Sequence, residues 1–241
     1  MPQQETALRA LAFAKRVRRG ILNRVHRYVL DRSFDEHRGV QTTGIHQPET
    51  LDLRGENATL AVEYEPTPAL LFKSVIAAVP EDLSRFVFID LGSGKGRVLL
   101  MAAELPFSRI EGVELSPKMH QIAAANVASN KNGGTHIISH NLDATEYEFP
   151  PEPFVMYLFN PFQEAVVARV LRNLERSFRQ SPRPGYIVYV NARHRTVFDA
   201  ADFLEEVPRS WLSVAIHKLV SPWPVALYRT IHTHVMSGGR T

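Results

Sequence analysis

The sequence contains no cysteine and only two tryptophans among its 241 residues. Without cysteine the chain has no disulfide bond, no thiolate ligand for zinc and no cysteine nucleophile. It also lacks any apolar run near the roughly 20 residues that a membrane-spanning helix needs. Arginines interrupt the N-terminal stretch where a secretory signal would be continuously apolar. These absences favour a cytoplasmic protein.

Composition and charge divide the chain into two parts. Hydrophobic residues make up 44% and charged residues 22%, as in an ordinary globular protein. Residues 1–40 carry nine basic and four acidic side chains, a net charge of +5, against +3 for the whole chain. We therefore predict a basic helical arm and linker over residues 1–45 and one main domain over residues 46–241.

The arm contains a predicted amphipathic helix over residues 6–30. Phe13, Val17, Ile21 and Val25 recur every four residues, and arginines occupy another face. Three interpretations stay open: the helix docks on the main domain, lies on an anionic membrane surface, or binds an acidic partner. No aromatic residues interleave with the arginines as base stacking requires, so nucleic acid is not an expected partner.

The most informative stretch is FVFIDLGSGKGRVLL, residues 86–100. Phe86–Ile89 is a short apolar run that suits a parallel strand covered on both faces. Asp90 follows it, and Gly92, Gly94 and Gly96 then stand at every second position. Glycine allows a backbone to approach a ligand closely. The stretch predicts a strand, a glycine turn and a helix around a bound molecule.

The spacing of these glycines excludes two common nucleotide sites. A dinucleotide fingerprint needs a third glycine where this chain has Arg97. A phosphate-binding P-loop needs serine or threonine after its lysine, but Lys95 is followed by Gly96. The remaining pattern, D-x-G-x-G-x-G, resembles the first motif of the class I S-adenosylmethionine (SAM) methyltransferases. The resemblance implies SAM as cofactor, S-adenosylhomocysteine as product, and no metal. It also implies which residues surround the amino-acid part of SAM, namely Asp90, Gly92, Ser93, Gly94 and Gly96.

Two further acids follow predicted strands. Arg109–Glu114 reads as the second strand, and ligands bind beyond the carboxyl ends of strands in an open α/β sheet. Glu114 is therefore placed to accept hydrogen bonds from both ribose hydroxyls of an adenosine. Asp143 follows the predicted strand at residues 135–140, and its Asp-Ala pair resembles the family's adenine site. The alternative for Asp143 is an aspartate that caps a turn or helix.

The segment before the glycine turn has both a local and a functional interpretation. Locally, Thr67 is a candidate N-cap and Pro68 the first helical position, followed by a predicted helical run over residues 69–79. The Y-x-P-T-P pattern before D-L-G-S-G-x-G-R also resembles the archaeal and mitochondrial protein-lysine methyltransferases. That resemblance implies that Tyr64 lies near the incoming amine and Thr67 at the SAM site.

Asn160, Pro161 and Phe162 follow the fourth predicted strand, residues 154–160. They resemble a shortened N-P-P-Y signature of amino-group methyltransferases, whose oxygens orient the target amine. One proline is missing and Phe162 lacks the hydroxyl group. The resemblance implies that these three residues handle an amine acceptor. The alternative is a turn that simply ends the strand.

The remaining pattern predicts the fold class. A strand at Gly185–Val190, a helix at Thr196–Val207, and strands at Trp211–Val220 and Pro224–Ile231 complete the alternation. We expect an α/β fold: a Rossmann-like, doubly wound, seven-stranded sheet, mostly parallel with a closing antiparallel hairpin.

These features together predict a SAM-dependent methyltransferase acting on an amine, with a protein lysine as the candidate acceptor. The alternatives are O- or N-methylation of a small molecule or lipid headgroup, and a module that binds SAM without catalysis. The sequence determines neither the acceptor nor the oligomeric state.

Overall fold

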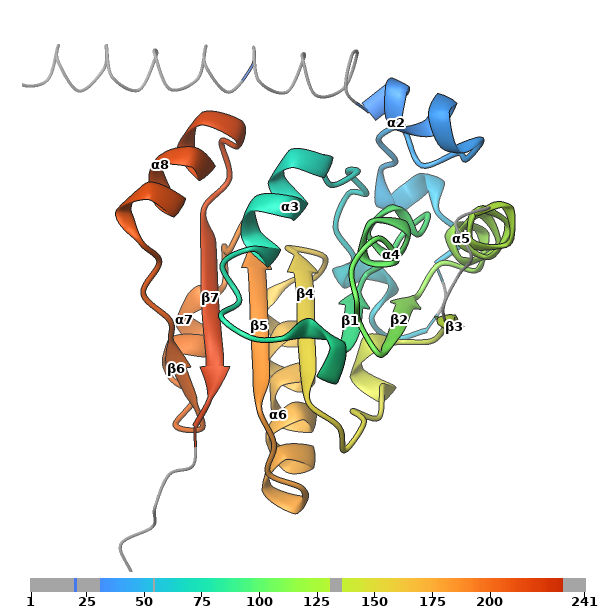
Figure 1. Ribbon diagram of the computed structural model, residues 1–241. Helices are drawn as coiled ribbons and strands as arrows, with labels where there is room; N and C mark the ends of the chain where they lie inside the picture. The colour runs from blue at the N-terminus through green and yellow to red at the C-terminus, as the bar shows by residue number, and fades with distance from the viewer. Residues whose placement is uncertain (1–19, 21–30, 54, 131–135, 232–241) are drawn as a thin grey trace, which may run out of the picture.

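The computed structural model describes residue 20 and residues 31–53, 55–130 and 136–231 (Figure 1). The helix predicted over residues 6–30 lies outside the described residues, apart from Gly20.

A seven-stranded sheet forms the centre of the molecule, in the order β3-β2-β1-β4-β5-β7-β6. The strands are β1 Val87–Leu91, β2 Arg109–Glu114, β3 Ile137–Asn141, β4 Phe154–Phe159, β5 Gly185–Val190, β6 Leu204–Glu206 and β7 Val225–Thr230. β1 to β5 pair in parallel, and β7 runs antiparallel between β5 and β6. The predicted fold class, a doubly wound and mostly parallel sheet, is confirmed.

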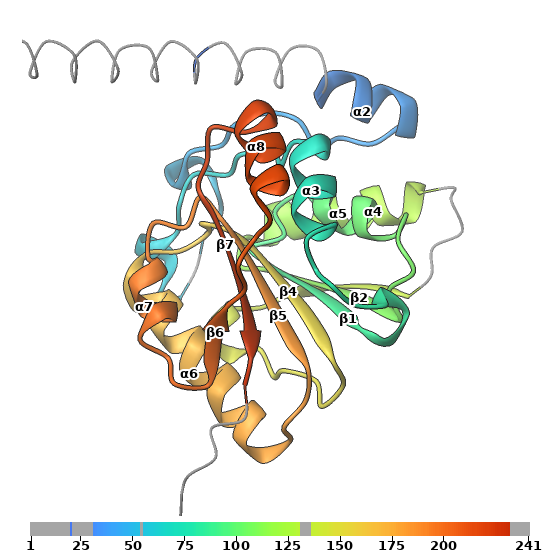
Figure 2. The same cartoon turned by 60° about the vertical axis from the view of Figure 1, so that its left-hand side comes forward.

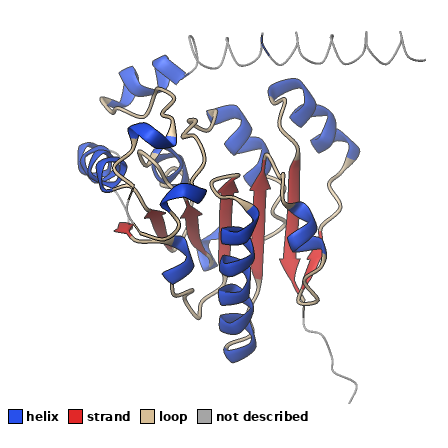
Figure 3. Cartoon of the chain, turned by 180° about the vertical axis from the view of Figure 1, so that it is seen from behind, coloured by secondary structure: helices blue, strands red, loops and turns tan. Residues whose placement is uncertain are grey.

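Helices cover both faces of this sheet. The α-helices are α2 Asp31–Arg38, α3 Ala69–Ile76, α4 Arg97–Ala102, α5 Pro117–Ser129, α6 Glu164–Gln180, α7 Arg195–Asp199 and α8 Trp211–Val220. Short 3₁₀ helices are η2 Pro48–Thr50, η3 Ala58–Leu60, η4 Leu83–Arg85 and η5 Ala144–Glu146. α3, α4, α5 and α8 lie on one face (Figure 2), and α6 and α7 lie on the other (Figure 3).

Two apolar clusters fill the space between the sheet and its helices. Side chains of a strand alternate between faces, so Phe88 of β1 belongs to the cluster under α3 and α4. Val87, Ile89 and Leu91 belong to the cluster under α6. Burial on both faces explains why the parallel strands read as continuous apolar runs in the sequence.

The prediction of a strand at residues 211–220 is wrong, because this segment is the helix α8. Trp211, Ala215 and Lys218 are exposed while His217 is buried. That spacing fits one helix face, whereas alternation along a strand would put residues 211, 215 and 217 on the same side. The helix packs beside α3 and connects β6 to β7.

The predicted helix at residues 196–207 is correct only in its first part. α7 ends at Asp199, and β6 begins at Leu204 on the outer edge of the sheet. The antiparallel pair that closes the sheet is therefore β6 with β7, rather than residues 211–220 with β7.

The order of the strands fixes where a ligand can bind. β2 and β3 lie on one side of β1, whereas β4 and β5 lie on the other. Such a switch point opens a crevice at the carboxyl ends of β1 and β4. The described end of the arm lies against Arg97 of α4, which contacts Phe34, Asp35 and Thr42. The domain boundary at residue 45 stays a prediction.

Leu174 tests the packing of α6 on the sheet. Its side chain is fully buried in the cluster under α6. We expect Leu174→Ala to lower the free energy of unfolding by about 2–5 kcal/mol, measured by urea denaturation, because it leaves a cavity. Arg172→Ala, at an exposed position of the same helix, should change it by less than about 0.5 kcal/mol. Equal effects of the two substitutions would contradict the assigned helix face.

Candidate functional site

A cavity at the carboxyl ends of β1 and β4 gathers the predicted site residues. It spans about 950 Å³ of empty space, a volume that includes open solvent at its mouth. Every predicted site residue except Gly96 and Asn160 lines it: Tyr64, Thr67, Asp90, Gly92, Ser93, Gly94, Glu114, Asp143, Pro161 and Phe162. Residues far apart in the sequence are thus brought to one place.

The glycine turn forms one wall of this cavity. Gly92 and Gly94 adopt φ angles of +83° and +52°, which other residues rarely adopt. A Cβ atom on Gly92 would lie 2.4 Å from Cβ of Pro161, and one on Gly94 would lie 2.2 Å from the ring of Tyr64. Both glycines are therefore required by the protein's own packing, in addition to any ligand.

Two carboxylates are buried side by side in the cavity. Asp90 is 3% exposed and Glu114 is 8% exposed. Glu114 accepts hydrogen bonds from the backbone nitrogens of Gly94 and Ser116, both at 2.8 Å. Burial raises the pKa of Glu114, and burial followed by the charge of Glu114 raises the pKa of Asp90. The pair favours a ligand that brings positive charge or hydroxyl donors.

Within the described part of the chain, two polar groups of this wall lack a protein partner. No other described side chain or backbone group donates a hydrogen bond to the carboxylate of Asp90. The hydroxyl oxygen of Ser93 is buried and has no hydrogen-bond partner. Buried polar groups are costly to leave unsatisfied, so both fit a ligand with complementary polar atoms. The ammonium and carboxylate of an amino acid are such atoms, and the site therefore fits the predicted cofactor.

Asp143 lies at the opposite end of the cavity. Its carboxylate accepts hydrogen bonds from the backbone of Thr145 and from the side chain of Asn57, both at 2.8 Å. Burial acts to raise the pKa of Asp143, but these hydrogen bonds outweigh it and lower the pKa. Asp143 thus caps η5, the alternative named from the sequence, and also lines the cavity.

The prediction that Thr67 caps α3 is wrong. The N-cap is Pro68, and α3 begins at Ala69. The hydroxyl of Thr67 instead lies 3.2 Å from the hydroxyl of Tyr157, a buried residue of β4 that also lines the cavity. Pro68 itself is extended, with φ −63° and ψ 134°, and the Thr67 side chain is buried against β4.

Asn160 and Gly96 lie outside this cavity. Gly96 precedes α4 and packs on Ala123. The amide oxygen of Asn160 accepts a hydrogen bond of 3.1 Å from the hydroxyl of Tyr189. A carbonyl oxygen has two lone pairs, so one remains for an incoming N–H group.

A neighbouring cavity of about 440 Å³ contains Asn160. It shares Val62, Glu63, Glu65 and Phe159 with the first cavity. Asn160 was predicted to handle the amine acceptor. Its position would place that contact in the smaller cavity, next to the main one.

A segment before α3 covers the glycine turn. We call residues 41–53 and 55–67 the strap. Its backbone pairs with itself at His46 and Tyr64, and with the loop after β4 through Ala61 and Phe162. The hydroxyl of Tyr64 donates to the carbonyl oxygen of Thr42 at 2.7 Å, inside the strap.

Sequence reasoning missed two residues at the site. Arg97 lines the cavity and is 2% exposed, although the sequence marked it only as the residue that breaks a dinucleotide fingerprint. Asn57 holds Asp143 from 86 residues away, and nothing in its local sequence signals this contact. For Arg97 the sequence does carry one signal, a charged residue within the otherwise apolar start of a helix.

Within the described residues, no group of three or more His, Asp or Glu side chains is arranged to hold a metal ion. Among the same residues, no helix combines the length and apolar character needed to cross a membrane. The expected absence of a metal stays a prediction.

Comparison with known proteins gives one family match. Residues 88–181 match a family model described as a methyltransferase domain. No curated protein matches the sequence significantly.

Similar solved structures include a ribosomal protein L11 methylase from Lactobacillus delbrueckii subsp. bulgaricus. It is 14% identical with a TM-score of 0.45, over 68% of this chain and 78% of that one. A magnesium protoporphyrin IX methyltransferase from Synechocystis PCC 6803 with bound SAM is 11% identical with a TM-score of 0.46, over 67% and 76%. A dimethyladenosine transferase from Plasmodium falciparum is 12% identical with a TM-score of 0.45, over 69% and 62%.

The family match covers the glycine turn, Glu114, Asp143 and the loop after β4. Over residues 88–181 the chain is therefore similar to a methyltransferase domain.

Proposed function

We propose that the main cavity binds SAM and that the enzyme transfers its methyl group to an amine. In this proposal Asp90, Ser93 and the backbone of Gly92 and Gly94 surround the amino-acid part of the cofactor. Glu114 accepts hydrogen bonds from the ribose hydroxyls. Asp143 accepts from the adenine amino group. SAM, when bound, supplies an electrophilic methyl group on a sulfonium ion.

The pair of buried carboxylates is the observation that carries this proposal. Asp90 and Glu114 are both nearly inaccessible, yet among the described residues only Glu114 receives hydrogen bonds from the protein. An ionised carboxylate in such a place is unfavourable unless a positive group or donors approach it. SAM carries an ammonium, a sulfonium and two ribose hydroxyls. A neutral or anionic ligand would leave the charge of Asp90 uncompensated.

The neighbouring cavity supports an amine as the acceptor. Glu63 and Glu65 line both cavities, and Asn160 lines the smaller one. Carboxylates at this junction attract a cationic side chain such as lysine, whose pKa is ordinarily about 10.4. Asn160 keeps one lone pair for an amine proton, and Pro161 and Phe162 line the cavity on the cofactor side. Arg193 also lines the smaller cavity, so the groups there that would favour an amine are the two carboxylates and the amide oxygen of Asn160.

Asp90→Asn tests the assignment of the carboxylates. Because burial disfavours the ionised Asp90, we expect the neutral variant to have a higher melting temperature than the wild type without ligand. Its affinity for SAM and S-adenosylhomocysteine, measured by calorimetry, should fall at least about tenfold, as a lost charge-assisted contact predicts. Glu148→Gln removes one exposed acid and should change neither quantity. Unchanged SAM affinity in Asp90→Asn would contradict the proposed site.

The raised pKa of Asp90 also predicts how SAM binding depends on pH. SAM favours the ionised carboxylate, so binding should lower the pKa of Asp90 and release a proton. Affinity should be full above the raised pKa. It should then fall as the pH decreases through that pKa, by about tenfold per unit until the bound-state pKa is reached. Calorimetry in buffers of different ionisation enthalpy measures how many protons are released when SAM binds. Asp90→Asn should abolish the release that comes from Asp90.

The acceptor class is tested with tritiated SAM and host-cell lysate, separated into protein, nucleic-acid, lipid and small-molecule fractions. We expect label in protein, on lysine. Glu63→Gln and Glu65→Gln should each slow labelling at limiting acceptor by about tenfold, the value of one charged contact. Both residues also line the main cavity, so calorimetry with SAM on each variant separates a lost acceptor contact from a change in cofactor affinity. Glu148→Gln is the matched control. Label confined to the lipid or small-molecule fraction would overturn the lysine acceptor, and SAM binding without any transfer would overturn catalysis.

A further inference from the structure

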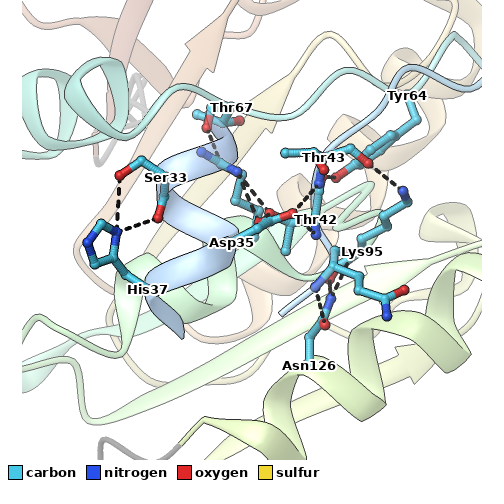
Figure 4. A network of polar contacts seen from close by, with 11 residues as sticks. Ser33, Asp35, His37, Thr42, Thr43, Tyr64, Thr67, Lys95 and Asn126 are labelled. Atoms are coloured by element: carbon cyan, nitrogen blue, oxygen red, sulfur yellow. Dashed lines mark hydrogen bonds and ion pairs between the residues drawn. The ribbon is translucent and has the colours of Figure 1, made fainter. Parts of the chain in front are cut away.

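Asp35, Thr42 and Thr67 take part in one network of polar contacts (Figure 4). The buried Arg97 contacts all three. Nε of Arg97 donates to the carbonyl oxygen of Thr67 at 2.9 Å, and Nη1 donates to the hydroxyl of Thr42 at 2.8 Å. Nη1 also lies 3.5 Å from the carboxylate of Asp35 in α2. The guanidinium plane is 4.0 Å from the centre of the Phe34 ring. One side chain of α4 thus holds α2 and both ends of the strap.

Asp35 extends this contact to the start of the strap. Its carboxylate accepts hydrogen bonds from the backbone nitrogens of Thr42 and Thr43, at 2.7 and 2.8 Å, and from the hydroxyl of Thr42. Asp35 is 8% exposed and Arg97 is 2% exposed. Buried opposite charges are stable only when their remaining donors and acceptors are satisfied, and the strap backbone satisfies them here.

The same strap residues set the position of Tyr64. The carbonyl oxygen of Thr42 accepts from the Tyr64 hydroxyl at 2.7 Å, and that of Thr43 accepts from Nζ of Lys95 at 2.6 Å. Asn126 of α5 holds the strap at Gln41, whose backbone nitrogen donates to the side-chain amide oxygen of Asn126 at 2.9 Å. The ring of Tyr64 then lies directly on Gly94, inside the cavity wall.

We propose that Arg97 is a positioning residue for the cofactor cavity, which latches the strap so that Tyr64 and Thr67 form its wall. This inference rests on the proposed cofactor site. A guanidinium has five donors in one plane and can bond the Thr67 carbonyl and the Thr42 hydroxyl together. An ammonium group cannot reproduce that arrangement, so lysine should not replace arginine here. The latched strap and the cofactor contact the same glycine turn, so each should stabilise the other.

The test compares Arg97→Lys with Arg183→Lys in the full-length protein. Arg183 is also buried, at 4%, but it bonds the carbonyl oxygens of Ser177 and Ser181, away from the cavity. Both substitutions disturb a buried arginine and should lower the melting temperature. We expect only Arg97→Lys to weaken SAM binding, by at least about tenfold, and to speed amide hydrogen exchange at residues 42–46 and 64–67. Exchange in β4 and β5 should stay as in the wild type.

Thr42→Val and Asp35→Asn keep the test decisive if Arg97→Lys does not fold. Each removes one partner of Arg97 and should cause the same local increase in exchange and a smaller loss of SAM affinity. Unchanged SAM affinity and unchanged strap exchange in a folded Arg97→Lys protein would overturn the proposal. So would equal losses of affinity in Arg97→Lys and Arg183→Lys. If the wild type binds no SAM, the proposed function fails, and the exchange measurement still accepts or rejects the latch.

Discussion

Close approach to the backbone of the glycine turn is the constraint on which the cavity depends. Pro161, from the loop after β4, lies against Gly92, and Tyr64, from the strap, lies against Gly94. A side chain at either glycine would displace these neighbours as well as strain the backbone. The turn therefore does two things: it exposes backbone nitrogens toward the cavity, and it lets two distant segments complete the walls. Packing within the protein therefore requires these glycines as much as ligand binding does.

Cationic and anionic side chains around the glycine turn have different surroundings. The two cations Lys95, within the turn, and Arg97, just after it, are hydrogen-bonded to the strap. The two carboxylates, Asp90 and Glu114, line the cavity. Backbone nitrogens offset the cost of burying Glu114, and strap oxygens offset that of burying Arg97. Asp90 alone of these four receives no such compensation from the described residues, which is why a cationic ligand fits this wall.

The strap runs from the arm to the junction of the two cavities. It begins next to α2, crosses the glycine turn at Tyr64, and pairs with Phe162 beyond β4. Glu63 and Glu65 flank Tyr64 and line both cavities. A displacement of the strap would therefore alter the walls of both cavities. In the proposed function, cofactor binding and acceptor recognition thus share one structural element.

The sequence by itself determined the strand, the glycine turn and the acids at the next strand ends. Those features are local: an apolar run followed by Asp90, Gly92 and Gly94 has few other conformations, and parallel order brings strand ends to one edge. Tertiary structure decided the rest. The run at 211–220 suits a strand or a helix, and its packing beside α3 selects the helix. Thr67 and Arg97 each form hydrogen bonds with residues far away in the sequence, and no local pattern predicts such contacts.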